Sequence, residues 1–135
     1  MSAVLVFVSH GTLAEGVYSS AAMMLGETED IRRFCLENGE DSASFRCRVR
    51  DGIRDLKDRP VLLFCDLLGG SPMTITLDEL TQAGIPVTGV YGGLNLAMAV
   101  AAYIHRDRDD VQERILREGK ASVAALSAGK EEDEI

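Results

Sequence analysis

Two residues that can perform nucleophilic or acid–base chemistry each follow a short apolar run. His10 comes directly after the run 3–9, and Asp66 directly after the run 61–65. A carboxylate that accepts a hydrogen bond from one imidazole nitrogen fixes the tautomer and makes the other nitrogen a better nucleophile. It also stabilises the ring when that second nitrogen carries a phosphoryl group. The pair predicts a catalytic, nucleophilic His10, oriented and stabilised by Asp66, if the fold brings the two together.

Two loops have the composition of anion-binding turns. Gly69 and Gly70 follow the acidic residue, and Ser71-Pro72 has the pattern of a helix start, with serine at the N-cap and proline at the first helical position. Glycine lets backbone N–H groups turn toward a small anion, and a helix N-terminus adds more donors. We expect Gly69, Gly70 and Ser71 to bind phosphate, although a tight turn and simple capping are alternatives. The expected pocket wall consists of Gly11, Leu67, Gly93 and Asn95.

Hydrophobic periodicity predicts the elements that must position these loops. Short apolar runs predict strands at 3–9, 30–36, 61–65 and 87–91, with a short final strand at 121–126. Helical spacing of apolar residues predicts helices at 12–25, 45–56, 71–84, 95–105 and 109–119, with Gly119 as the last stop.

The alternation of strands and helices predicts a single-domain, doubly wound α/β fold with a mostly parallel sheet flanked by helices. The runs 3–9 and 61–65 are apolar throughout, which is typical of central strands, whereas 30–36 is weaker and suits an edge. These features favour the strand order 2-1-3-4. Ligands bind such sheets beyond the carboxyl ends of the strands, at the switch point between the first and third strands, which His10 and Asp66 follow.

The composition is that of a cytoplasmic domain. A formal net charge of −8 argues against nucleic-acid binding and against adsorption to anionic membranes. No run approaches the roughly 20 apolar residues that span a bilayer, and the start lacks the basic region of a secretory signal. We expect a domain over residues 1–128 and an acidic disordered tail over 129–135.

Other kinds of site find no support in the sequence. It contains no G-x-G-x-x-G, no P-loop, no G-x-S-x-G and no metal-ligand spacing, so we expect no metal and no organic cofactor. Cys35, Cys47 and Cys65 are expected to be buried reduced thiols. His105, on an apolar helical stripe, is expected to be structural.

Three signatures in order resemble the enzyme IIA domain of the mannose-type (mannose/fructose/sorbose) sugar phosphotransferase system. They are Val-Ser-His-Gly at 8–11, with Ala14, Gly16 and Met-Leu-Gly at 24–26; Asp-Leu-Leu-Gly-Gly-Ser-Pro at 66–72; and Gly-Leu-Asn-Leu-Ala-Met at 93–98. The resemblance extends from residue 3 to about residue 126. It implies that His10 is phosphorylated at Nε2 while Asp66 bonds Nδ1. It also implies phospho-HPr as the phosphoryl donor and a histidine of enzyme IIB as the acceptor, in the service of sugar uptake.

The resemblance further implies a homodimer in which the C-terminal strand, here at 121–126, crosses to the other subunit. It implies no cofactor. Two positions beside the pocket depart from the family pattern: Ala97 stands where proline is usual, and Thr74 where asparagine is frequent. These two departures would affect how well partner proteins fit the site.

Three other functions stay open at this point. A phosphocarrier for a dihydroxyacetone kinase is less favoured, because the loop after Asp66 there resembles Met-Gly-Ser-Ala rather than the sequence at 67–72. A regulatory module would be phosphorylated at His10 but signal to another protein. A small hydrolase would use Asp66 or Ser71. The sequence indicates neither the sugar nor whether enzyme IIB is a separate chain.

Overall fold

A parallel sheet forms the centre of the molecule. The computed structural model describes residues 2–129. The sheet has four strands in the order β2-β1-β3-β4, all neighbours parallel. The strands are β1 (Val4–His10), β2 (Ile31–Leu36), β3 (Val61–Cys65) and β4 (Val87–Tyr91). The predicted α/β class and strand order 2-1-3-4 are confirmed.

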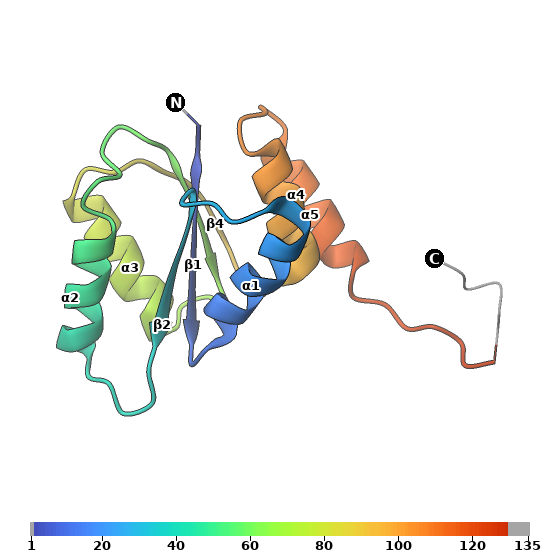
Figure 1. The fold of residues 1–135 in the computed structure, drawn as a ribbon, viewed down its shortest axis with the longest axis horizontal. Coiled ribbons are helices and arrows are strands. Elements are labelled where there is room, and N and C mark those ends of the chain that lie inside the picture. Colours follow the sequence, from blue (N-terminus) through green and yellow to red (C-terminus); the bar gives the residue numbers. More distant parts are fainter. Residues whose placement is uncertain (1, 130–135) are drawn as a thin grey trace.

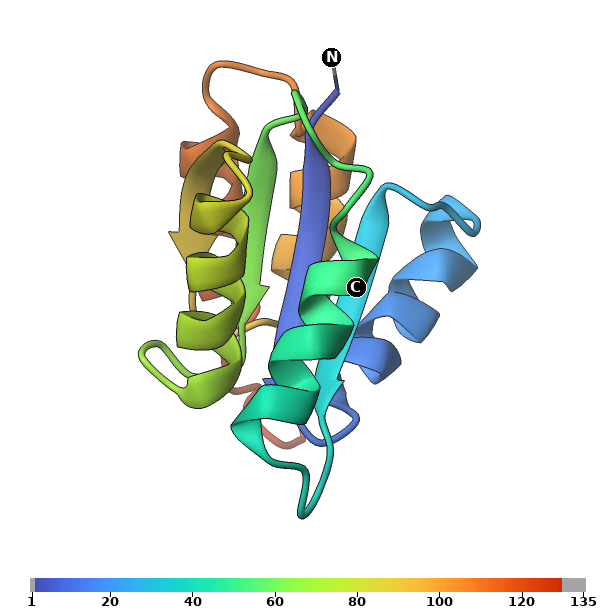
Figure 2. The ribbon, with the colours of Figure 1, turned by 90° about the vertical axis from the view of Figure 1, so that its left-hand side faces the viewer.

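Helices cover both faces of this sheet (Figures 1 and 2). The helices α2 (Ser42–Gly52) and α3 (Ser71–Gln82) pack on one face. The other face carries α1 (Leu13–Leu25), α4 (Leu96–His105) and α5 (Val111–Ala121). No helix within residues 2–129 combines the length and apolar character needed to cross a membrane.

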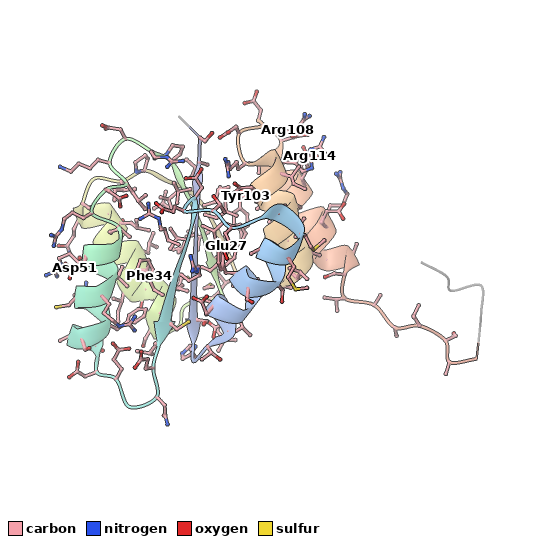
Figure 3. The ribbon with its side chains drawn as sticks, in the orientation of Figure 1. Glu27, Phe34, Asp51, Tyr103, Arg108 and Arg114 are labelled. Carbon is pink, nitrogen blue, oxygen red and sulfur yellow. The ribbon has the colours of Figure 1, made fainter. Side chains whose placement is uncertain are left out.

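The central strands are apolar on both sides because they contribute to two cores. Alternate residues of β1 point to opposite faces, so Val6 packs with α2 and α3 whereas Phe7 packs with the α1, α4 and α5 layer. Phe34 extends the first core from β2 toward α2 (Figure 3). Full burial of one such side chain contributes roughly 1.5–3 kcal/mol, which holds the layers, and therefore the loops at the strand ends, in place.

The ends of α2 and α5 are among those that differ from the prediction. Ile53 and Leu56 are buried as expected, but α2 ends at Gly52 and both residues pack from the following turns. Gly119, predicted to stop the last helix, lies inside α5. A Cβ atom at this glycine would come within 2.8 Å of the Met98 Cε atom, so glycine here permits close packing of α4 against α5.

The predicted strand at 121–126 is not present in the single chain. Ala121 belongs to α5, and residues 122–129 form no strand but lead away from the body of the domain (Figure 1). The physical reason is that an extended segment becomes a strand only when it pairs with a sheet edge. Residues 130–135 of the predicted tail lie outside the described residues.

The cysteines are buried to different degrees. Cys65 is buried, Cys35 is half-buried and Cys47 is exposed, so the prediction of three buried thiols is wrong for Cys47. Phe45 and Val49 form the buried stripe of α2, and Cys47 lies midway between them in sequence, on the opposite side of the helix.

A buried carboxylate joins the two helices on the α2–α3 face. Glu79 of α3 is only 4% exposed. Its Oε1 atom accepts from Arg50 Nε at 2.9 Å, and its Oε2 atom accepts from Arg46 Nη1 at 2.6 Å. The hydrogen bond from Arg50, with that from Arg46, lowers the pKa of Glu79. The ion pairs thus favour the folded state whenever Glu79 is ionised.

We predict that Glu79→Gln lowers the free energy of unfolding at pH 7 by about 1 kcal/mol, because charge-assisted hydrogen bonds become neutral ones. The pKa of Glu79 is lower in the folded state, so this stabilisation is present above the unfolded-state pKa of about 4.3 and is lost as the pH falls through the folded-state value. Urea unfolding between pH 3 and pH 8 measures the effect. The wild-type and variant curves should converge in acid.

The matched control is Asp51→Asn. Asp51 pairs with Arg54 on the outer side of α2 (Figure 3), and both side chains are largely exposed. Exposed pairs contribute little, so this variant should follow the wild type at every pH. A Glu79→Gln difference that stays constant from pH 3 to pH 8 would contradict the assigned role.

Candidate functional site

The candidate site lies at the carboxyl edge of the sheet, where β1 and β3 run side by side. Val8 is paired with Cys65 in the parallel register. The residues that follow, His10 and Asp66, therefore leave the sheet at the same edge although 56 positions separate them in sequence. The sheet brings together the two residues predicted to be the phosphoacceptor and its carboxylate.

One carboxylate oxygen binds both the backbone and the ring of the histidine. Asp66 Oδ2 accepts from the His10 backbone N–H at 2.9 Å and lies 2.9 Å from His10 Nδ1. The other oxygen, Oδ1, accepts from the Leu67 N–H at 2.9 Å. Partial burial by itself raises the pKa of Asp66, but the hydrogen bonds from His10 and Leu67 outweigh it and lower this pKa. Asp66 is therefore an ionised carboxylate at neutral pH.

This carboxylate decides which ring nitrogen of His10 is reactive. An ionised carboxylate only accepts hydrogen bonds, so Nδ1 must carry the hydrogen and donate it. Nε2 then holds the lone pair of the neutral ring. The His10 side chain is 46% exposed and that of Asp66 17%. The arrangement presents a nucleophilic nitrogen to solvent while its supporting carboxylate stays mostly covered.

The start of α3 adjoins the reactive side of the ring. A Cβ atom on Gly70 would lie 3.0 Å from His10 Cε1 and 3.7 Å from Nε2, so glycine allows this close approach. Gly70, and not Ser71 as predicted, occupies the N-cap, and Ser71 begins the helix. Its exposed hydroxyl makes no hydrogen bond to the described residues. Gly70 thus brings the N-terminus of α3 against the ring, and the first N–H groups of a helix lack intrahelical partners.

Most of the predicted wall residues surround this pair. The Gly93 N–H donates to the Asp66 carbonyl at 3.3 Å, and the Gly11 N–H donates to the Leu36 carbonyl at 2.8 Å. Gly69 turns with a φ of +83°. Leu67 is 63% exposed and forms an apolar rim with Leu68, which is 68% exposed.

Asn95, predicted as part of the pocket wall, and His105, predicted to be structural, lie at the two ends of α4. The Asn95 side chain caps α4 by accepting from the Met98 N–H at 3.0 Å, and it also donates to the Gly93 carbonyl at 3.2 Å. It lines a groove beside α5. His105 is the last residue of α4, which runs from the site edge of the sheet toward the opposite edge.

Sequence reasoning missed one polar side chain at this edge. Ser9 is completely buried, and its hydroxyl bonds to the backbone on both sides of the turn that follows His10. Its signal in the sequence is a single hydroxyl residue at the end of an otherwise apolar run. Within residues 2–129, no group of three or more His, Cys, Asp or Glu side chains has the arrangement of a metal site.

The fold and the site define an α/β protein with a carboxylate-supported histidine at the switch point of its sheet. A family model described as "PTS system fructose IIA component" matches residues 4–117. The chain belongs to this family, the mannose-type enzyme IIA proteins of the sugar phosphotransferase system. Membership implies phosphotransferase activity in general and interaction with HPr and enzyme IIB as a class.

Several solved structures share this fold. A mannose/sorbose-specific IIA subunit from Enterococcus faecalis superposes with a TM-score of 0.80 at 24% identity, over 96% of this chain and 98% of that one. A IIA protein associated with the fucose utilization operon of Streptococcus pneumoniae gives 0.78 at 25% identity, over 93% of each chain. A sigma-54 interaction domain protein from E. faecalis gives 0.72 at 15% identity, over 90% and 93%, and shares the fold.

We predict that Asp66→Asn changes the tautomer of His10. In the wild type, the carboxylate should hold nearly all of the neutral ring form with the hydrogen on Nδ1. An uncharged amide accepts more weakly and also donates, so the variant should show a mixture of tautomers. Long-range ¹H–¹⁵N spectra of the imidazole measure the ratio. Asp51→Asn is the control, and an unchanged ratio in folded Asp66→Asn would count against the assignment of the reactive nitrogen.

Proposed function

We propose that this protein is a cytoplasmic phosphocarrier that takes a phosphoryl group from phospho-HPr onto His10 and passes it to a histidine of enzyme IIB for sugar uptake. The observation that carries the proposal is the hydrogen bond between His10 Nδ1 and Asp66 Oδ2 at 2.9 Å. Family membership supports a phosphocarrier role of this class.

The chemical step is a displacement at phosphorus. The lone pair of His10 Nε2 forms the new P–N bond, while the P–N bond of the donor phosphohistidine breaks and its electron pair stays with the donor ring. His10 keeps its hydrogen on Nδ1, so the phosphorylated ring gains positive character. Asp66 offsets this charge. The reverse displacement, with the acceptor histidine as nucleophile, releases the phosphoryl group to enzyme IIB.

The beginning of α3 supplies the expected binding site for the phosphoryl oxygens. Gly70 lies against the ring beside Nε2, and the Ser71 hydroxyl is available for a further hydrogen bond. The backbone donors and the positive end of the helix dipole favour a negative group there without a metal ion. Gly69 turns the loop into this position.

Partner proteins would dock on the open edge around His10. The exposed Leu67 and Leu68 offer a small apolar rim next to the reactive nitrogen. A small rim suits complexes that form and dissociate quickly, as a relay requires. The two departures from the family pattern lie close by: the Thr74 hydroxyl donates to the Ser71 carbonyl at 3.3 Å, and Ala97 lies in the first turn of α4.

We predict one acid-labile phosphoryl group per chain after incubation with phosphoenolpyruvate, enzyme I and HPr, read by intact-mass spectrometry. His10→Ala should abolish the addition. His105→Ala is the matched control, because it removes the only other histidine of the sequence and should leave phosphorylation intact. Transfer onward to enzyme IIB separates a transport role from a regulatory one. An unphosphorylated wild type, with a working control carrier, would overturn the proposal.

We also propose that the protein is a homodimer in which the segment after α5 adds to the sheet of a second copy. The edge strand β4 pairs only with β3 among the described residues, so one side of its backbone is open. Val123 is 80% and Leu126 72% exposed in the single chain. Exchange of this segment would pair the open edge and cover both side chains.

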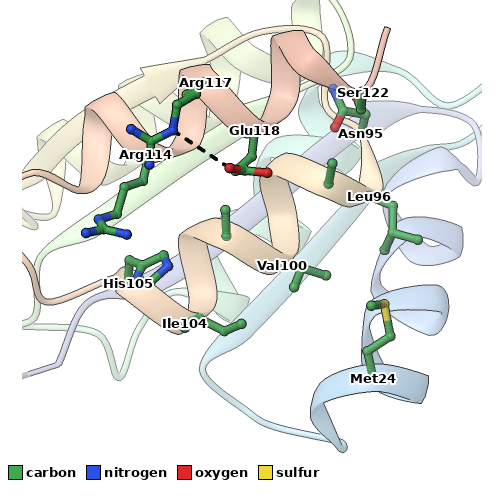
Figure 4. Close-up of a pocket in the computed structure, with 12 residues that line it drawn as sticks. Met24, Asn95, Leu96, Val100, Ile104, His105, Arg114, Arg117, Glu118 and Ser122 are labelled. Carbon is green, nitrogen blue, oxygen red and sulfur yellow. Dashed lines mark ion pairs between the residues drawn. The ribbon is translucent and has the colours of Figure 1, made fainter. Parts of the chain in front are cut away.

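An apolar groove supports the same proposal. It has a volume of about 670 Å³ and lies between α1, α4 and α5 (Figure 4). Met24 of α1 faces the α4 residues Leu96 and Val100 across it, and Ile104 continues the apolar lining. Apolar surface of this kind is typical of a subunit interface.

We predict that wild type elutes as a dimer in size-exclusion chromatography with light scattering. Val123→Asp combined with Leu126→Asp should shift it to the monomer, because two charges would be buried in the exchanged position. Ser127→Asp, which adds a charge just beyond the predicted strand, is the control. A double variant that remains dimeric at micromolar concentration would contradict the exchange of this segment.

A further inference from the structure

Among residues 2–129, Ser9 is the one fully buried polar residue that hydrogen bonds to the turn after His10. Its exposed fraction is 0%. The hydroxyl donates to the Gly11 carbonyl at 3.1 Å and accepts from the Ala14 N–H at 2.8 Å. Cys35 Sγ lies 3.9 Å away, and sulfur is a weak acceptor, so the single hydroxyl hydrogen belongs to the Gly11 carbonyl.

The Ser9 hydroxyl caps α1 in place of the side chain of the N-cap residue. Thr12 occupies the N-cap position with a φ of −88° and a ψ of 7°, and its side chain makes no capping hydrogen bond. An N-cap side chain normally accepts from the second or third helical amide. Here Ser9, at the end of β1, accepts from Ala14, the second residue of α1. Ser9 thus joins the strand end directly to the helix start.

This link determines the path of the chain through His10. The histidine lies between Ser9 and Gly11, whose carbonyl the hydroxyl holds. Gly11 has a φ of +60°, and its N–H donates to the Leu36 carbonyl at 2.8 Å. The turn is therefore fixed on one side by β2 and on the other by Ser9.

The position of the turn matters because Asp66 binds the His10 backbone as well as the ring. The same Oδ2 atom accepts from the backbone N–H and lies within hydrogen-bond distance of Nδ1, each at 2.9 Å. Both contacts persist only if the backbone of His10 keeps its orientation. A turn that relaxes would shift the amide and the imidazole together.

We propose that Ser9 is a positioning residue for the phosphoacceptor: its buried hydroxyl clamps the β1–α1 turn so that His10 meets Asp66 with its backbone N–H and its Nδ1–H at once. The proposal rests on the proposed function for its consequence in phosphoryl transfer. The geometry of His10 is measured separately on the unphosphorylated protein, so that failure of the phosphocarrier function and failure of the Ser9 role give different results.

The test compares four variants of the full chain. Ser9→Ala removes the hydroxyl, and Ser9→Thr keeps it on a side chain suited to a strand end. Thr76→Val is the matched control, because the Thr76 hydroxyl is also buried but has no hydrogen-bond partner among the described residues. Ser9→Cys is made as well, since it preserves volume with a weaker hydrogen-bonding group in case the alanine variant does not fold.

Three readouts are taken on each folded variant. In Ser9→Ala, the amide exchange rate of Ala14 should rise at least tenfold. The imidazole nitrogens of His10 should show a mixture of tautomers at pH 8.5, and phosphorylation by phospho-HPr should slow about 10- to 100-fold. Ser9→Thr should recover most of the tautomer preference and rate. Thr76→Val should match the wild type in all three, and Ser9→Cys should lie between wild type and alanine.

The outcomes separate the possibilities. A folded Ser9→Ala or Ser9→Cys with the wild-type tautomer ratio and the wild-type rate would overturn the proposal, whatever its melting temperature. A changed tautomer ratio with no phosphorylation of the wild type would support the positioning role and reject the phosphocarrier function. Equal losses in Ser9→Ala and Thr76→Val would mean that any buried hydroxyl has this effect, and would also overturn it.

Discussion

The site depends on one electrostatic constraint: a single carboxylate oxygen must serve both the backbone and the ring of His10. Asp66 can do so only as an anion, and hydrogen bonds from His10 and Leu67 keep its pKa low despite partial burial. The ionised carboxylate keeps the hydrogen of the neutral ring on Nδ1. The lone pair therefore stays on Nε2. The ring nitrogen that keeps its lone pair is therefore decided by an acceptor in the loop after β3.

The rest of the fold serves to keep that acceptor beside the histidine. β1 and β3 are adjacent because both are apolar on their two faces and gain most from the central positions of the sheet. Helices on either side cover these faces and leave the carboxyl edge of the strands open. Few polar side chains are buried in this body; Ser9 and Glu79 are two, and both have hydrogen-bond partners. Ser9 lies in β1 and bonds to the turn that follows it, whereas Glu79 ties α2 to α3.

The openness of the site is consistent with a reaction between proteins. The His10 ring is nearly half exposed, and the rim beside it is apolar but small. Under the proposed function, a donor histidine would reach Nε2 without a lid or a deep cleft. A sigma-54 interaction domain protein shares the fold at 15% identity. A shared fold does not by itself imply a shared function, so function is argued from the site.

The sequence by itself determined the α/β class, the strand order and the pairing of His10 with Asp66, because apolar runs report burial and parallel strands end at one edge. It also predicted a glycine loop after Asp66, and Gly70 of this loop lies against the ring. Only the tertiary structure decided that Gly119 packs α5 against Met98 and that Ser9 links β1 to α1. Those roles depend on which atoms face one another across elements, and a residue pattern along one chain carries no such distances. The segment after α5 shows the same limit: an extended sequence becomes a strand only where a sheet edge is available to pair with it.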